Sequence, residues 1–296
     1  MTKPFSRSRL SGVVLGFTLL LALTSACTRT NPSAIAEVLP EANHSTSTAD
    51  RLSGLRAANV IYLGERHDSV ADHEAQLEII EALHAENPDV AIALEMFQRP
   101  FQPVLDQYLV GEITEEQLVE QSEYEQRWGF PWALYAPIVR FAKTNQIPLI
   151  ALNAPTDVVR QVARQGLESL ESEDLEYIPP LEDIHTDNEN YRAFVLQALG
   201  AHGSHGDFNP DNFFAAQLIW DETMAERIAQ FHTANPDTQI IVLAGQGHVL
   251  YGYGIPDRVA RRLGEALSQQ IVVLNPSEAI AAQTNSADLF WYNTAN

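Results

Sequence analysis

Short apolar runs alternate with segments of helical period along most of this chain. The runs have the length and β-branched content of buried strands and lie at 59–63, 90–94, 147–152, 239–243, 271–274 and 288–292. Between them, apolar residues recur every three or four positions, which predicts helices at about 70–86, 131–145, 155–168, 187–199, 210–233 and 256–268. Alternating strands and helices predict an α/β fold with a mainly parallel sheet flanked by helices, and 187–233 forms an inserted helical pair.

Two predicted strands run directly into a turn that carries Gly-x-x-His. The first leads into Gly64-Glu65-Arg66-His67-Asp68 and the second into Gly245-Gln246-Gly247-His248. Ligands of open parallel sheets bind outside the carboxyl ends of the strands, so we expect both histidines at one edge. Glu95 follows a third strand, where an unpaired buried carboxylate would be costly. It therefore either forms a salt bridge with an arginine or belongs to a site.

Histidine and carboxylate side chains suit Mn, Fe, Co or Zn. On this hypothesis His67, His248 and Glu95 bind one divalent transition metal. Glu65 would then act as general base on a metal-bound water, whose pKa the metal lowers toward 7. Glu65 and Glu95 are accordingly the candidate catalytic residues, and the reaction class is metal-dependent hydrolysis.

Four further polar residues are candidates for a supporting role. Asp68 ends the first turn, and Asn153 follows the strand at 147–152. Gln217 and Asp221 lie four residues apart on the predicted helix 210–233, on the stripe that carries its apolar residues. Polar groups in that position border the buried face of the helix.

An aromatic cluster and a histidine pair each leave two interpretations open. The cluster comprises Tyr124, Trp128, Phe130, Trp132 and Tyr135. It is either ordinary core for the helix 131–145 or a flat apolar wall for a planar ligand.

The histidine pair, His202 and His205, lies in a glycine-rich loop. These side chains either contact a transition metal or the edge of a haem, or are simply solvated.

The first 26 residues predict a signal peptide. Lys3, Arg7 and Arg9 precede an apolar run that is too short to span a bilayer. The run ends at Cys27, the only cysteine, in a sequence that resembles a bacterial lipobox. We expect lipidation of Cys27, a flexible tether over 27–50 and a single domain over 51–296. Ordinary cleavage after Ala26 is the alternative.

Charge restricts the partners of the mature chain. The whole chain has 18 basic and 39 acidic residues, and losing the three bases of the signal peptide leaves 15 − 39 = −24. This balance argues against nucleic acid as a partner and against electrostatic binding to anionic lipid. Membrane attachment would depend on acyl chains at Cys27, which places the protein in the cell envelope, facing the periplasm or the outside.

Five motifs resemble the ChaN-like family of bacterial haem-binding lipoproteins, over roughly residues 52–292. They are Gly64–Asp68, Leu94–Met96, Ala216-Gln217 with Asp221 and Met224-Ala225, Gly245–His248, and Gly254–Pro256. The family is similar to the Tiki, TraB and erythromycin-esterase group, some members of which are metal-dependent hydrolases. The resemblance implies an α/β fold, a candidate metal site at the strand ends and haem binding through a tyrosine. Tyr135 and Tyr124 are the candidate tyrosines, and the His202–His205 loop is a candidate second contact.

Three functions are compatible with these features. The first is a lipid-anchored haem-binding protein in iron or haem uptake, with haem, haem-delivering membrane proteins and a second copy in a homodimer as partners. Tyrosinate or histidine can hold haem iron. The second is a metal-dependent hydrolase, protease- or esterase-like. The third is a structural lipoprotein, which does not explain ionisable residues at several strand ends.

Overall fold

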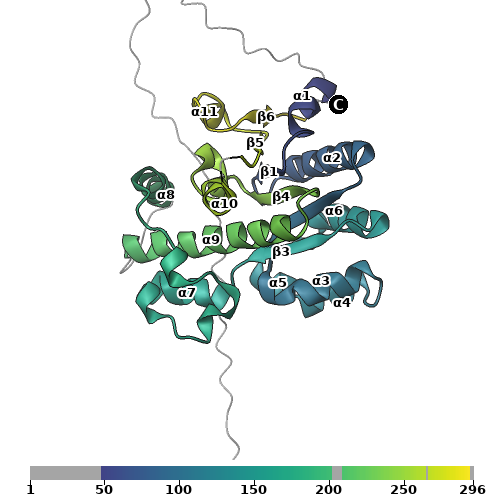
Figure 1. The fold of residues 1–296 in the computed structure, drawn as a ribbon. Helices are drawn as coiled ribbons and strands as arrows, with labels where there is room; N and C mark the ends of the chain where they lie inside the picture. The colour runs from purple at the N-terminus through teal and green to yellow at the C-terminus, as the bar shows by residue number, and fades with distance from the viewer. Residues whose placement is uncertain (1–47, 202–208, 265, 294–296) are drawn as a thin grey trace, which may run out of the picture.

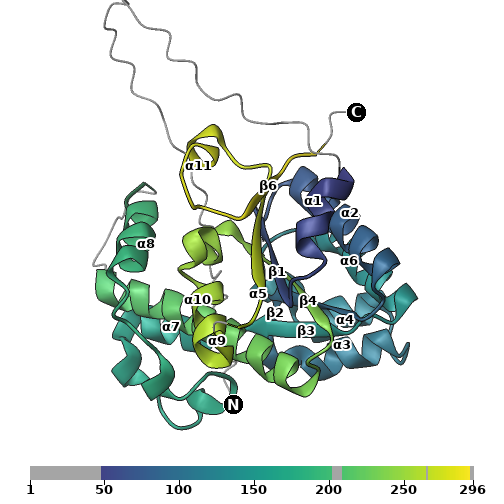
Figure 2. The same cartoon turned by 45° about the horizontal axis from the view of Figure 1, so that its top comes forward.

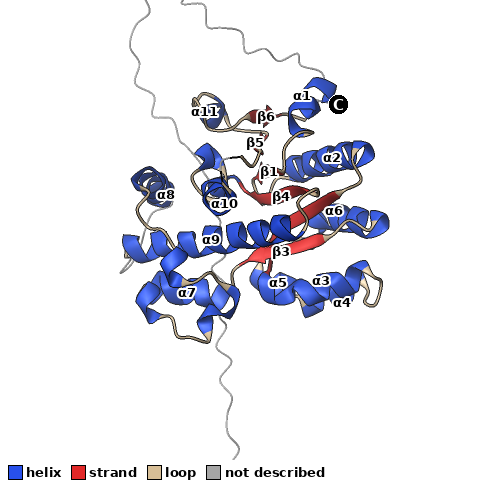
Figure 3. Ribbon diagram, in the orientation of Figure 1, coloured by secondary structure: helices blue, strands red, loops and turns tan. Residues whose placement is uncertain are grey.

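The protein is built around one six-stranded sheet in which every neighbouring pair of strands is parallel (Figures 1 and 3). This computed structural model describes residues 48–201, 209–264 and 266–293. The strands are β1 Val60–Glu65, β2 Val90–Gln98, β3 Leu149–Asn153, β4 Gln239–Gly245, β5 Gln269–Leu274 and β6 Leu289–Trp291. The α/β fold with a parallel sheet is therefore confirmed. All six predicted strands form, with ends that shift by a few residues.

The order of strands in the sheet is β3-β2-β4-β1-β5-β6. The chain leaves a space between β1 and β2, which β4 fills after the two long helices α8 and α9 have been completed. Glu65 at the end of β1 pairs with Gly245 at the end of β4, and Leu94 of β2 pairs with Leu243. The three strand ends that carry the Gly-x-x-His turns and Glu95 are therefore adjacent.

Helices cover both faces of the sheet (Figure 2). The α-helices are α1 Thr48–Leu55, α2 Val70–Glu86, α3 Gln102–Leu109, α4 Glu115–Gln121, α5 Tyr124–Arg127, α6 Trp132–Asn145, α7 Thr156–Gln165, α8 Glu189–Ala201, α9 Pro210–Ala234, α10 Ile255–Leu263 and α11 Glu278–Ala281. Short 3₁₀ turns are η1 Arg99–Phe101, η2 Leu167–Ser169, η3 Asp174–Tyr177, η4 Leu181–Asp183, η5 Gln246–His248 and η6 Leu250–Gly252.

Two apolar cores lie on opposite faces of the sheet. One contains Ile61, Leu63 and Leu94 with residues from α1, α2, α3 and α6. The other contains Val60 and Tyr62 with residues from α9 and α10. Alternate strand residues point to opposite faces, and burial of both faces explains the continuous apolar runs in the sequence. Within the described part of the chain, no helix combines the length and the apolar content needed to cross a bilayer.

Local signals set the ends of the helix that follows the first turn. The side chain of Ser69 accepts a hydrogen bond from the backbone N–H of Asp72 at the start of α2. The helix ends at Glu86, just before Asn87 and Pro88. The N-terminal helix α1 was not predicted, and it begins three residues before the expected domain boundary at Arg51.

The outer edge of β3 is closed by one side chain. The amide of Gln102 donates to the carbonyl of Leu149 (2.8 Å) and accepts from the N–H of Ala151 (2.8 Å). Gln102 thus takes the place of a further strand at these two positions.

Candidate functional site

The first Gly-x-x-His turn holds a buried carboxylate at the end of β1. Glu65 is 1% exposed, and its Oε1 accepts hydrogen bonds from His67 Nδ1 (2.9 Å) and the Tyr135 hydroxyl (2.6 Å). Its Oε2 accepts from the amide of Gln76 on α2 (2.5 Å). The first turn is therefore held together by contacts from β1, α2 and α6. Three hydrogen bonds from side chains of the protein thus engage the Glu65 carboxylate.

The second turn has a similar arrangement, with a carboxylate from another element. His248 Nδ1 lies 2.6 Å from Oδ1 of Asp221 on α9. The other oxygen of Asp221 accepts a hydrogen bond from the Tyr191 hydroxyl of α8 (2.5 Å). The amide nitrogen of Gln217 lies 3.0 Å from His248 Nδ1 and donates to the Tyr191 hydroxyl (3.2 Å). The predicted supporting residues Gln217 and Asp221 thus contact His248.

Glu95 lies between the two turns. One of its oxygens accepts the backbone N–H of Gly245 (2.6 Å), and the other lies 3.3 Å from His248 Nε2. Gly245 also packs against His67, because a Cβ at Gly245 would lie 2.8 Å from the imidazole ring. A side chain at Gly245 would displace His67, so a glycine is needed where β4 passes the first turn.

Charge interactions shift the pKa values of these buried groups. Burial works to raise the pKa of Glu95, but the positive charges of His248 and His67 lower it to about 2. Burial works to lower the pKa of His248, but the carboxylates of Glu95 and Asp221 raise it to about 10. The pKa of His67 is raised against burial by Glu95 and Glu65, and that of Glu65 is lowered against burial by His67 and His73.

Glu65, His67, Glu95, His248 and Asp221 thus form a strand-end cluster in which carboxylates and imidazoles alternate. Both ring nitrogens of His248 face carboxylates, Nδ1 that of Asp221 and Nε2 that of Glu95. Among the described residues, no group of three or more His, Cys, Asp and Glu side chains is arranged to hold a metal ion. The predicted transition metal at His67, Glu95 and His248 is not supported by this arrangement.

The aromatic cluster is core. Tyr124 and Tyr135 are each 1% exposed, and burial raises the pKa of both phenols. Trp128 and Phe130 pack beside His67, with ring centroids 4.8 and 5.0 Å from the imidazole. The aromatic cluster therefore packs against the first turn, and the side chains of Tyr124 and Tyr135 are both buried.

Asp68 and Asn153 are the remaining candidates among the described residues. Asp68 is exposed, and the Asn153 side chain accepts the neighbouring N–H of Ala154 (2.9 Å). Cys27, His202 and His205 lie outside the described residues.

Three residues that contact the strand-end cluster were not predicted from the sequence. Gln76 and His73 are buried polar residues three positions apart on α2. That spacing places them on one helical face and could have shown that this face meets the turn. Tyr191 lies near the start of α8, where the sequence has no distinguishing pattern, and its contact with Asp221 depends on tertiary packing.

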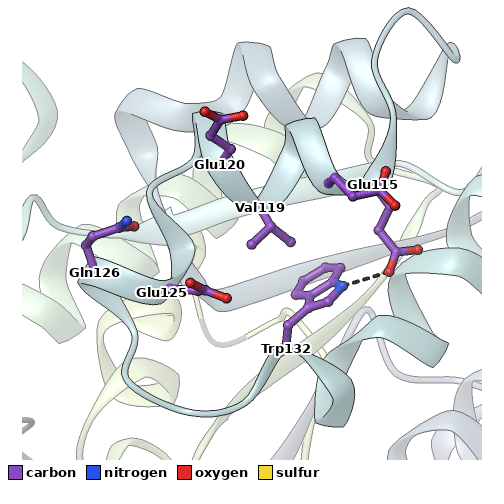
Figure 4. Close-up of a pocket in the computed structure, with 7 residues that line it drawn as sticks. Glu115, Val119, Glu120, Glu125, Gln126 and Trp132 are labelled. Atoms are coloured by element: carbon purple, nitrogen blue, oxygen red, sulfur yellow. Dashed lines mark hydrogen bonds between the residues drawn. The ribbon is translucent and has the colours of Figure 1, made fainter.

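A surface hollow of about 370 Å³ lies elsewhere, among α4, α5 and α6 (Figure 4). It is lined by Glu115, Glu116, Val119, Glu120, Glu125, Gln126 and Trp132. The indole N–H of Trp132 donates to Glu115 (2.8 Å), and Arg140 pairs with the same carboxylate. None of the residues that line this hollow belongs to the strand-end cluster.

Comparison with known proteins places the fold in a family. The model of the family described as haem-binding uptake, Tiki superfamily, ChaN, matches residues 52–259. The chain belongs to this ChaN family. The match includes β1, β2 and β4, and with them every residue of the strand-end cluster.

Individual proteins similar to this chain have low sequence identity to it. The solved structure described as cofacial heme binding to ChaN of Campylobacter jejuni has a TM-score of 0.67 and 20% identity, covering 82% of this chain and 91% of that one. It shows the shared fold. Protein RETICULATA-RELATED 5, chloroplastic, of Arabidopsis thaliana is 28% identical over 80% of this chain, which spans 34% of that protein.

An erythromycin esterase mutant, EreC, matches more weakly. Its TM-score is 0.43 at 13% identity, covering 75% of this chain and 70% of that one. A similarity this low gives the hydrolase alternative no support over haem binding.

Proposed function

We propose that this protein binds haem and acts in haem uptake or handling in the cell envelope. The observation that carries the proposal is the ChaN family match over residues 52–259. The similarity in fold to the Campylobacter jejuni ChaN, whose structure is described by its cofacial heme, supports it.

Two partly exposed tyrosines fit haem better than the buried pair. The rings of Tyr251 and Tyr253 stack with centroids 5.3 Å apart and an angle of 24° between the planes, and Phe194 packs on Tyr251 (5.7 Å). Phe194 meets Tyr251 edge-on, with 73° between the ring planes, so the three rings form a partly exposed aromatic group that can pack on a planar ligand. Tyrosinate is one of the side chains that can hold haem iron. We therefore move the proposed haem contact from Tyr124 and Tyr135 to Tyr251 and Tyr253.

The backbone of Tyr251 gives a second reason for this choice. Its φ is +59° and its ψ is 5°, a left-handed conformation that a tyrosine rarely adopts. The N–H of Tyr251 donates to the carbonyl of Ser286 (2.9 Å), which holds the residue in place. Strained residues of this kind concentrate at ligand sites.

Titration of the protein with haemin tests the proposal. We expect a saturable Soret shift for the wild type that weakens at least about tenfold in Tyr251→Phe or Tyr253→Phe, a loss of about 1.4 kcal/mol. Tyr177→Phe, in η3 between α7 and α8, is the matched control and should bind as the wild type does. Absence of a saturable shift in the wild type would refute haem binding. An unchanged shift in both variants would refute only the proposed tyrosines.

Attachment to a membrane through Cys27 is the second part of the proposal. The lipobox-like sequence before Cys27 supports it. Mass spectrometry of the protein from bacterial membranes should find a diacylglycerol on an N-terminal Cys27, and Cys27→Ala should move the protein to the soluble fraction. An unmodified cysteine in membrane-free protein would contradict the anchor and leave haem binding unaffected.

A further inference from the structure

Three arginines of α10 surround a single buried carboxylate of α9. Glu222 is 0% exposed. Arg261 Nη2 contacts both of its oxygens (2.5 and 2.7 Å), Arg262 Nη2 contacts one (2.6 Å), and Arg258 Nε lies 3.2 Å from the other. The backbone N–H of His185 also donates to Glu222 (3.4 Å). We refer to these three arginines and Glu222 as the arginine cluster.

The arginine cluster carries more positive charge than its carboxylate can neutralise. Three guanidinium groups and one carboxylate leave a formal surplus of +2. Asp257 is the only other acid within 4.0 Å of these arginines in the described chain, and its side chain is 52% exposed to water. A partly buried cation surplus is unfavourable without a counter-charge.

Hydrogen-bond donors are also in surplus. A carboxylate has about four acceptor positions, whereas each guanidinium has five N–H groups. Arg258 Nη1 finds the carbonyls of Tyr253 and Gly254 (2.6 and 2.9 Å). The buried atoms Arg258 Nε and Arg262 Nη2 have no hydrogen bond of good geometry, although both lie near Glu222. The cluster thus lacks acceptors as well as negative charge.

The other arginine ion pairs of the described chain differ from this cluster. Arg99 pairs with Glu226, Arg140 with Glu115, and Arg127 with both Glu123 and Asp157. Each of these cations has at least one acid to itself or shares acids with no more than one other arginine. The surplus is therefore a local property of the α9–α10 contact and stands out in a chain of net charge −21.

We propose that the arginine cluster binds a second anion, a phosphate or carboxylate group of a small molecule, through Arg261 and Arg262. These two side chains are 31% and 16% exposed, so an anion can reach them from solvent, whereas Arg258 is 1% exposed. Guanidinium groups match the planar or tetrahedral oxygens of such anions and bind them with paired hydrogen bonds. Arg258 is a positioning residue that holds Glu222 beneath the site.

Titration of the full mature protein with inorganic phosphate, followed by calorimetry and by the ¹⁵Nε signals of the arginines, tests this proposal. We expect saturable binding with shifts at Arg261 and Arg262. In Arg261→Gln/Arg262→Gln the affinity should fall at least tenfold. Arg192→Gln is the matched control: Arg192 is a similarly exposed arginine (34%) paired with Asp211. Phosphate binding should be unchanged in this control.

Two results would overturn the proposal: no saturable phosphate binding by the wild type, or equal binding by the folded double variant. If the double variant does not fold, the wild-type arginine signals decide. Unchanged signals at saturating phosphate reject the site.

A parallel haemin titration identifies the source of the anion. Weaker haemin binding by the double variant assigns the site to haem propionates, and unchanged haemin binding assigns it to another oxyanion. Phosphate binding is measured without haem, so it can succeed even where the haem proposal fails.

Discussion

The two Gly-x-x-His turns hold their histidines with the same types of side chain, but these side chains come from different parts of the chain. In each, a tyrosine hydroxyl donates to a carboxylate that receives a histidine Nδ1. In the first turn the carboxylate is Glu65, two residues before its histidine. In the second it is Asp221, on the long helix α9 and 27 residues before His248. The first turn is a local motif, and the second exists only in the folded chain.

Their charge environments differ as well. His248 lies between two carboxylates that it contacts directly, Glu95 and Asp221, whereas Glu65 is the only carboxylate of the described residues that His67 contacts directly. The second turn therefore depends more strongly on ion pairs formed between separate elements. Disruption of the second turn should consequently destabilise the fold more than the equivalent disruption of the first.

The largest effect should come from a backbone contact of the second turn. A Cβ at Gly254 would lie 2.2 Å from the carbonyl oxygen of His248, which cannot move without displacing the turn. We expect Gly254→Ala to lower the free energy of unfolding by more than about 4 kcal/mol, measured by urea denaturation. A Cβ at Gly54 meets no atom within 4 Å, so Gly54→Ala should change stability by less than about 1 kcal/mol. Similar values for the two variants would contradict the close approach of Gly254 to His248.

Removal of one carboxylate charge should have the next largest effect on the free energy of unfolding, and the size of the loss should differ between the two turns. Asp221→Asn leaves a buried, protonated His248 without one partner and should cost about 3 kcal/mol. Glu65→Gln keeps acceptors for His67 and Tyr135 and should cost about 1–2 kcal/mol. Chemical denaturation at pH 7 measures both variants. A greater loss in Glu65→Gln would reverse the proposed order of the two turns.

The pH dependence of stability should report on the second turn. The pKa of His248 is raised from 6.5 to about 10, so its contribution is fully present below pH 6.5 and is lost as the pH rises to about 10. The pKa of Glu95 is lowered from 4.5 to about 2, so its contribution is lost only as the pH falls below 4.5 toward 2. Stability measured from pH 6 to 10 should decline in the wild type and decline less steeply in His248→Gln. Parallel curves would show that His248 is not protonated in the native state.

The smallest effects should come from the two tyrosine hydroxyls. Tyr191→Phe and Tyr135→Phe each remove one hydrogen bond to a buried carboxylate that keeps its histidine partner, and each should cost about 1 kcal/mol. Tyr124 is a neighbour of Tyr135, and its buried hydroxyl has no hydrogen-bond partner among the described residues. Tyr124→Phe should therefore be neutral or slightly stabilising in the same thermal or urea measurement. A loss as large as that of Tyr135→Phe would contradict the pairing of Tyr135 with Glu65.

The fold was predictable where local signals were complete. The helix predicted at about 70–86 forms over the same residues because Ser69 caps its start and Asn87-Pro88 end it. The predictions for α7 and α10 extended too far, to 168 and 268. The helices end instead at Gln165 and Leu263, because Gly166 and Gly264 adopt positive φ values of 86° and 88°. Those two glycines were visible in the sequence as stop signals.

The candidate site was predictable in its position but not in its chemistry. The rule for parallel sheets places the ends of β1, β2 and β4 at one edge, and the sequence identifies His67, Glu95 and His248 there. The partners that engage Glu65 and His248 come from α2, α6, α8 and α9. No spacing along the chain indicates which donors reach a carboxylate after folding, so the sequence could not show that Glu65 is already occupied.

Gln102 has a consequence for the association of whole molecules. Its side-chain amide occupies a donor and an acceptor of β3 that an incoming strand would need. Two copies of the protein are therefore hindered from joining their sheets through this edge into a continuous, fibril-like array. The opposite edge is formed by β6, which is only three residues long and offers little length for such growth.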